Sequence, residues 1–129
     1  MELTADAFSP AEIRLLADLG FAAAGRADVA RAETIFAGLR DLRATRAFPY
    51  IGLATAYMNA GRPDEAVLAL QSALEHVQDE RAEIDAFLGL ALQMAGRTAE
   101  SGRALERAAG GPQQSDGARL ARHMLGRRD

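Results

Sequence analysis

The side chains best suited to acid–base or metal chemistry are few and scattered in this sequence. His76 and His123 are its only two histidines, and no carboxylate is spaced to tie them together. His76 falls near the end of a predicted helix, where a positive charge is favoured, and His123 belongs to a basic terminal stretch. We therefore expect surface or capping roles for both histidines rather than catalysis or metal binding.

The acidic pairs Asp64-Glu65 and Asp79-Glu80 stand where predicted helices begin, and carboxylates there complement the partial positive charge of a helix N-terminus. Gly110-Gly111 lacks the lysine and the strand-to-helix context of a phosphate-binding loop, so it indicates a helix break. The chain has no cysteine, which excludes disulfides, thiolate metal sites and cysteine catalysis. The sequence thus predicts that the protein is not an enzyme and holds no cofactor.

The composition indicates one all-α domain over residues 1–129. Hydrophobic residues make up 49% of the chain and aromatic residues only 5%, so the core must consist mainly of alanine and leucine, which favour helices. The net charge of −3 gives no support for nucleic-acid binding. The first residues lack the basic and apolar regions of a secretory signal, and no apolar run reaches the roughly 20 residues that span a bilayer. We expect a cytoplasmic protein without membrane insertion.

A repeated tripeptide organises the chain. It occurs as Ala24-Gly25-Arg26, Ala60-Gly61-Arg62 and Ala95-Gly96-Arg97, with the glycines 36 and 35 residues apart. Residues 11–24, 47–60 and 82–95 precede these glycines with helical apolar spacing, and residues 28–42, 63–76 and 98–109 follow them in the same way. Glycine tolerates the positive φ of a helix C-terminal turn, so each tripeptide predicts a turn between two helices.

Local capping residues support these helices. Ser9-Pro10-Ala11-Glu12 is a capping box with proline in the first turn, and Pro63 suits a first turn for the same reason. One helical hairpin cannot bury its apolar stripe alone, so three hairpins must stack. A last helix at about residues 116–126 is expected to cover the third hairpin. The arginines of this basic tail, which face either water or an acidic partner, are Arg119, Arg122, Arg127 and Arg128.

The middle unit resembles the tetratricopeptide repeat. The residues that carry this resemblance are Tyr50, Leu53, Ala54, Tyr57, Gly61, Ala66, Leu70 and Ala73. The third unit matches less fully, with Ser101 in place of a small alanine, and the first departs at Asp18 and Thr34. The family period is about 34 residues, so extra residues must be absorbed between units. The resemblance implies a right-handed superhelix of three stacked hairpins, at about residues 10–44, 46–78 and 81–110, plus a C-terminal capping helix.

The resemblance also implies a binding groove, because ligands of this family lie against the first helix of each hairpin. With each turn glycine aligned, the groove would be lined by Leu15, Leu19, Phe48, Ile51, Thr55, Met58, Asn59, Ala86, Leu90, Gln93 and Met94. This lining is apolar and adaptable, and it lacks the basic residues of a carboxylate clamp. The alternative is that some of these residues, above all Leu15, Leu19 and Leu90, belong to the core.

Size, repeat number and groove character resemble the small tetratricopeptide chaperones of bacterial type III secretion. By that resemblance, the protein would bind an amphipathic helix or extended segment of a protein partner and mask it until export. The alternative is a general repeat scaffold in a multiprotein assembly, or one that forms homo-oligomers through its outer faces.

Overall fold

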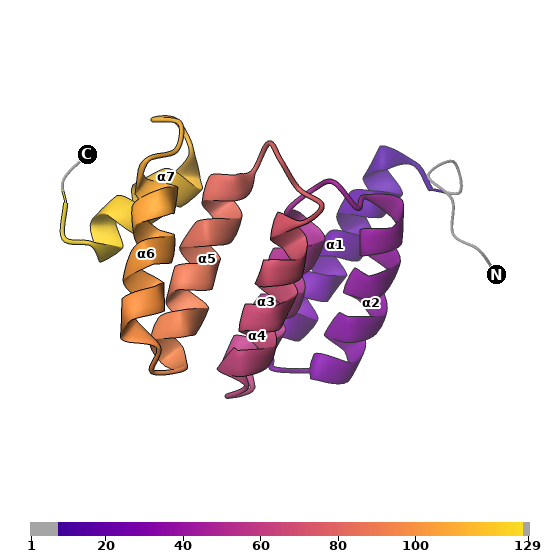
Figure 1. Ribbon diagram of the computed structural model, residues 1–129. Coiled ribbons are helices and arrows are strands. Elements are labelled where there is room, and N and C mark those ends of the chain that lie inside the picture. The colour runs from indigo at the N-terminus through magenta and orange to yellow at the C-terminus, as the bar shows by residue number, and fades with distance from the viewer. Residues whose placement is uncertain (1–7, 128–129) are drawn as a thin grey trace.

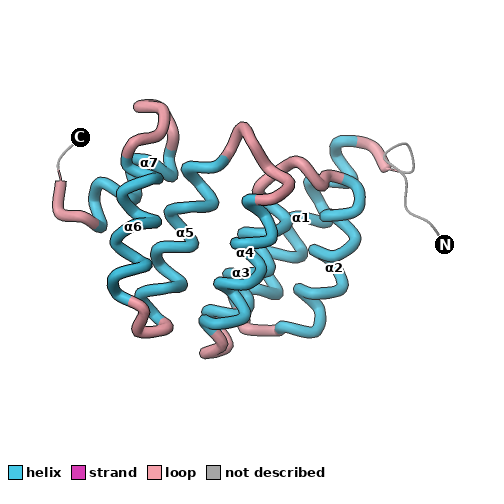
Figure 2. Tube along the Cα trace, in the orientation of Figure 1, coloured by secondary structure: helices cyan, strands magenta, loops and turns pink. Residues whose placement is uncertain are grey.

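The computed structural model describes residues 8–127, and these form seven helices and no strand (Figures 1 and 2). The helices are α1 (Pro10–Gly25), α2 (Val29–Leu42), α3 (Phe48–Asn59), α4 (Pro63–Leu74), α5 (Arg81–Met94), α6 (Thr98–Ala109) and α7 (Asp116–Met124). The predicted all-α class is confirmed, and each predicted helix agrees within two residues at either end. The expectations about a secretory signal and Arg128 fall outside the described residues.

The helices pack as three consecutive hairpins, α1–α2, α3–α4 and α5–α6, followed by α7 (Figure 1). The first helix of a hairpin also packs on its neighbours: α3 contacts α1 and α2, α5 contacts α3 and α4, and α7 contacts α5 and α6. The first hairpin and α7 therefore lie at opposite ends of a row of helices (Figure 1).

The core lies along this row in three clusters. One cluster of buried side chains fills the space between α1, α2 and α3, and a second lies between α3, α4 and α5. Leu53 packs against both clusters. A third cluster, around Leu105, joins α5, α6 and α7. Each hairpin thus covers the apolar stripe of its neighbour, as stacked helical units require.

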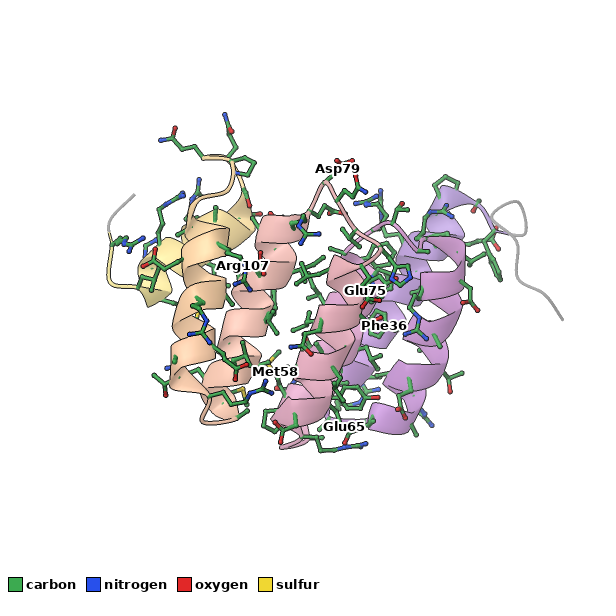
Figure 3. All side chains as sticks on the ribbon, viewed as in Figure 1. Phe36, Met58, Glu65, Glu75, Asp79 and Arg107 are labelled. Carbon is green, nitrogen blue, oxygen red and sulfur yellow. The ribbon has the colours of Figure 1, made fainter. Side chains whose placement is uncertain are left out.

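Glycines let large side chains pass between the first and second hairpins. A Cβ added at Gly20 or Gly52 would collide with the ring of Phe36, which is almost fully buried between α1 and α3 (Figure 3). A Cβ at Gly89 would likewise lie 2.5 Å from Leu105 in the third hairpin. The close packing of a large residue on a position without a side chain therefore recurs along the row.

The same turn ends four of the helices. Ala27, Gly61, Gly96 and Gly126 have φ values of +57°, +75°, +78° and +78°. In each turn, the N–H that follows this residue donates to a carbonyl five residues earlier, at distances from 2.8 to 2.9 Å. This pattern is the Schellman motif, which satisfies the last carbonyls of a helix. We call these four positions the turn residues.

The first turn is not where the tripeptide places it. Gly25 is the last residue of α1, and the left-handed position belongs to Ala27, so the prediction of a turn at Gly25 is wrong. The predictions at Gly61 and Gly96 are confirmed. Asp28 follows Ala27 as the N-cap of α2, where its carboxylate accepts a hydrogen bond from the N–H of Arg31. The turn residues 27, 61 and 96 are therefore 34 and 35 residues apart.

This register predicts opposite effects for two substitutions in the first turn. Ala27→Gly should raise the free energy of unfolding by roughly 1 kcal/mol, because a residue with a Cβ pays about that much for a left-handed conformation. Gly25→Ala should leave stability unchanged or raise it by about 0.5 kcal/mol, since a Cβ there meets nothing within 4 Å and alanine favours the helix. Urea unfolding followed by circular dichroism measures both. If Gly25→Ala were destabilising and Ala27→Gly neutral, the left-handed residue of this turn would be Gly25 and not Ala27.

Candidate binding face on the first helices

The four helices that precede the turn residues form one surface, which we call the first-helix face. α1 packs beside α3, α3 beside α5, and α5 beside α7. Each of these helices has one residue that lies six positions before its turn residue. We call these four residues the apolar row: Phe21, Thr55, Leu90 and Leu120. Phe21 and Leu120 are each 38% exposed, and Thr55 and Leu90 are half-buried. The row therefore presents carbon surface to solvent from α1 to α7.

A hollow of about 400 Å³ lies between α1 and α3 at one end of this row. Its apolar lining includes Ala17, Phe21 and Phe48. The ring of Phe21 meets that of Phe36 edge to face, with centroids 5.0 Å apart, so the floor of the hollow continues into the core. The hollow has the size and apolar floor to hold one large side chain of a ligand.

Several of the predicted groove residues share this face. Phe48 lines the hollow, Ile51 and Leu90 are half-buried, and Gln93 and Met94 are exposed. The hydroxyl of Thr55 donates to the carbonyl of Ile51 at 2.7 Å, within its own helix.

Asn59 has a structural role in this arrangement. Its side-chain N–H₂ donates to the carbonyl of Ala24 at 2.9 Å and so joins the end of α3 to the end of α1. Its amide N–H₂ is therefore engaged inside the protein, although the residue itself is exposed.

Two of the predicted residues lie inside the molecule. Met58 belongs to the cluster between α3, α4 and α5, and Ala86 to the cluster between α5, α6 and α7. Neither offers surface to a partner, so a charged residue at position 58 would test folding rather than binding.

Leu15 and Leu19 lie off the apolar row because of the two-residue shift in the first turn. Counted from the turn residues, Leu19 corresponds to Leu53 and Leu88, which pack against the preceding hairpin. Among the described residues nothing covers this edge of α1, and Leu15 and Leu19 are 59% and 52% exposed. Ala17 and Phe21 take the places on the face that the sequence-based alignment assigns to these leucines.

The residues that the alignment missed had signals in the sequence. Leu19-Gly20, Leu53-Ala54 and Leu88-Gly89 stand 34 and 35 residues apart, and this spacing marks the true register of α1. Gly-Arg also occurs at residues 102–103, inside α6, and at residues 126–127, where the positive φ of Gly126 marks α7 as a fourth helix of the first kind. Both signals lead to Phe21 and Leu120, the two ends of the apolar row.

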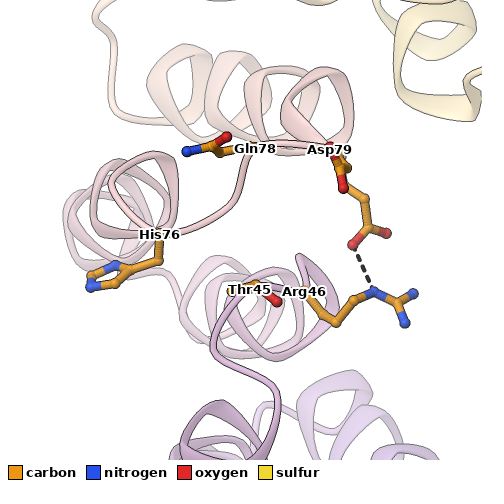
Figure 4. Close-up of a pocket in the computed structure, with 6 residues that line it drawn as sticks. Thr45, Arg46, His76, Gln78 and Asp79 are labelled. Atoms are coloured by element: carbon orange, nitrogen blue, oxygen red, sulfur yellow. Dashed lines mark hydrogen bonds and ion pairs between the residues drawn. The ribbon is translucent and has the colours of Figure 1, made fainter.

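Two further hollows continue from the first along the loops at one end of the helices. The smaller, of about 490 Å³, shares Arg46 with the hollow between α1 and α3 (Figure 4). There Arg46 donates to the carboxylate of Glu80 at 2.9 Å, and the same carboxylate accepts the N–H of Ala47. Burial raises the pKa of Glu80, but these two hydrogen bonds outweigh it and hold the pKa below its ordinary value. The side chain of His76 points away from this pair (Figure 4).

The larger hollow, of about 910 Å³, lies where the starts of α5 and α7 meet. It shares Asp79 and Glu80 with the smaller one. Within it the buried carboxylate of Asp85 faces the guanidinium of Arg107 at 3.3 Å. Glu83 accepts hydrogen bonds from the hydroxyl of Ser115 and the N–H of Gly117, and it thereby fixes the start of α7.

His76 is the one histidine that lines these three hollows. His76 stacks on Tyr50, and its Nδ1 lies 3.0 Å from the carbonyl of Ser72. Residues 8–127 bring together no group of three histidine, aspartate or glutamate side chains that could hold a metal ion. In the same range no helix is both long enough and apolar enough to cross a bilayer.

Comparison with protein-family models, with curated proteins and with solved structures finds no match for this chain in any of the three.

Tyr57 joins the first two hairpins and predicts a pH dependence. Burial is the largest cause that raises its pKa to about 12, and the hydrogen bond from its hydroxyl to Glu33, at 2.6 Å, raises it further. The unfolded phenol has a pKa of about 10. Tyr57 therefore makes its full contribution to the free energy of unfolding below pH 10, and this contribution should be lost as the pH rises through about 12.

Tyrosinate absorbance measures this shift directly, because Tyr50 is the only other tyrosine and the chain has no tryptophan. In a Tyr50→Phe variant the absorbance should rise with a midpoint near pH 12 while the protein stays helical, and near pH 10 in urea. A midpoint near 10 in the folded variant would contradict the buried hydrogen bond to Glu33.

Proposed function

We propose that the chain is a right-handed array of three tetratricopeptide-like hairpins, followed by α7 as a fourth helix of the first kind. The intervals of 34 and 35 residues between the turn residues support this, since the repeat in that family measures about 34 residues. A second observation supports the array: a small residue packs against a large one in two hairpins, Gly20 against Phe36 and Gly89 against Leu105.

On this basis, the protein binds a segment of a partner protein along the first-helix face. The observation that carries the proposal is the apolar row, in which Phe21 and Leu120 are partly exposed with no covering element among the described residues. Each apolar side chain that a ligand buries contributes about 1.5–3 kcal/mol, and loss of translational and rotational freedom opposes it. Several anchors are therefore needed, which an amphipathic helix or an extended segment supplies.

The role that fits such a module is a chaperone or adaptor that masks the apolar surface of its partner. We propose a role like that of the tetratricopeptide chaperones of type III secretion, with a cytoplasmic location. Support for it comes from the three packed hairpins and the apolar character of the face.

A second candidate, a self-associating scaffold, is favoured by one observation. Leu15 and Leu19 form an exposed apolar edge on α1, where the corresponding Leu53 and Leu88 are covered by a preceding hairpin. A scaffold of this kind would show concentration-dependent oligomers in light scattering, and Leu19→Glu would abolish them.

The binding proposal predicts the effect of charges placed in the apolar row. Peptides selected from a random-sequence display library on the wild-type protein should lose at least about tenfold in affinity for Phe21→Glu and for Leu120→Glu, because each substitution forces a charge against apolar surface. Fluorescence anisotropy of the labelled peptides measures this.

Leu68→Glu is the matched control, since Leu68 lies on α4, is 65% exposed and belongs to a second helix. It should leave affinity unchanged, and circular dichroism should show all three variants to be as helical as the wild type. If the selected peptides bound Phe21→Glu, Leu120→Glu and wild type with equal affinity, the binding surface would not lie on the first helices.

A further inference from the structure

The hollow between α1 and α3 combines an apolar floor with a basic rim. Arg14, Arg43 and Arg46 line it together with a single acid, Asp18. Arg46 is paired with Glu80, so Arg14 and Arg43 against Asp18 leave one positive charge, on a chain whose overall charge is negative. Arg14 is exposed, and its side chain has no partner among residues 8–127. Its guanidinium lies at the surface, where an acidic group of a ligand would reach it.

The hollow at α5 and α7 has the opposite charge. Its acidic lining comprises Asp79, Glu80, Glu83, Asp85 and Asp116. Arg81 and Arg107 are its only basic residues and Glu80 is paired with Arg46, so four carboxylates against two guanidinium groups leave two negative charges. Asp79 is exposed at the tip of its loop (Figure 3).

A third hollow adjoins both of these hollows. The hollow shown in Figure 4 shares Arg46 with the basic end and Asp79 with the acidic end. The basic and acidic hollows both reach the first-helix face, because Arg14, Phe48 and Glu83, which line them, are each thirteen residues before a turn residue. The hollow between them is lined by residues of the two loops that precede α3 and α5. The charge of the face therefore changes sign from α1 to α7, alongside the apolar row.

We infer that this face binds its partner segment in one direction, with acidic side chains of the segment beside α1 and basic side chains beside α5 and α7. This inference rests on the proposed function, and it names the chemistry of the partner: an amphipathic segment with apolar anchors and charges of opposite sign at its two ends. The apolar row supplies affinity, and the charges set the direction, because a reversed segment would bring like charges together at both ends.

The test uses two synthetic peptides with the same apolar anchors, taken from a peptide selected on the protein. One carries glutamates at one end and lysines at the other, and in the second peptide the acidic and basic positions are exchanged. The first peptide keeps the acidic and basic ends of the selected peptide in the same order. It should therefore bind wild type about tenfold more tightly than the second at low salt, because the charges at each end contribute about threefold to the affinity. The difference should shrink as salt is added.

Charge-reversed variants assign this preference to the two ends. Arg14→Glu combined with Asp79→Arg should remove most of the preference between the peptides, because it leaves the two ends with nearly the same charge. Arg103→Glu combined with Glu75→Arg is the matched control, because it makes the same changes in charge at exposed residues that line none of the three hollows. It should leave the preference intact.

The direction is measured with a nitroxide on the acidic end of the peptide. It should broaden the amide resonances around Arg14 and spare those around Asp116. Broadening around Asp116 instead would overturn the inference.

The other outcomes are distinct. Equal binding of both peptides by wild type would overturn the charge inference and leave the proposed function in place. Binding of both peptides that is insensitive to Phe21→Glu and Leu120→Glu would remove the proposed function itself. A wild-type dimer in light scattering that Arg14→Glu abolishes, and that the added Asp79→Arg restores, would make the occupant a second copy of this chain and overturn the inference.

Discussion

One backbone conformation, the left-handed residue that ends each first helix, organises this structure. The N–H after it returns to a carbonyl five residues earlier and reverses the chain at the same point of every hairpin. Because all four turns share this geometry, they set the positions from which every equivalent side chain is counted. The buried positions, the covered edges and the apolar row all follow from that register.

Packing extends the same constraint from one hairpin to the next. A hairpin leaves an apolar stripe that only a neighbour can cover, and glycines at positions such as Gly52 let that neighbour approach closely. The stripe of the first hairpin has no such cover among the described residues, which explains the exposed Leu15 and Leu19. At the other end α7 packs on α5 and α6 and buries Ala118 and Ala121. The two ends of the row are thus chemically different.

The fold was largely readable from the sequence, and the candidate site was not. Helical spacing and the turns at Gly61 and Gly96 gave the helices of the second and third hairpins almost to the residue. The first hairpin misled the alignment because alanine at position 27 adopts a conformation that normally calls for glycine, while Gly25 sits in an ordinary helical end. Because of this shift of two residues, the sequence predicted Leu19 at a groove position that Phe21 occupies in the structure.

Burial was the other point that the sequence could not show. Met58 and Ile51 are similar apolar residues on the same helix, yet Met58 lies in the core and Ile51 is half-buried at its edge. Only the approach of α4 and α5 to α3 separates them. The charge change along the face also depends on tertiary structure, since Arg14, Arg46 and Asp79 come from three different segments of the chain.

In the proposed complex the helices before the turn residues, and not the outer helices, contact the partner segment. Methyl resonances of the protein, recorded with and without a selected peptide, locate this contact. Binding should shift the methyl signals of Thr55, Leu90 and Leu120 and leave that of Leu68 in place. Shifts confined to Leu68, or to Leu15 and Leu19 on the edge of α1, would contradict it.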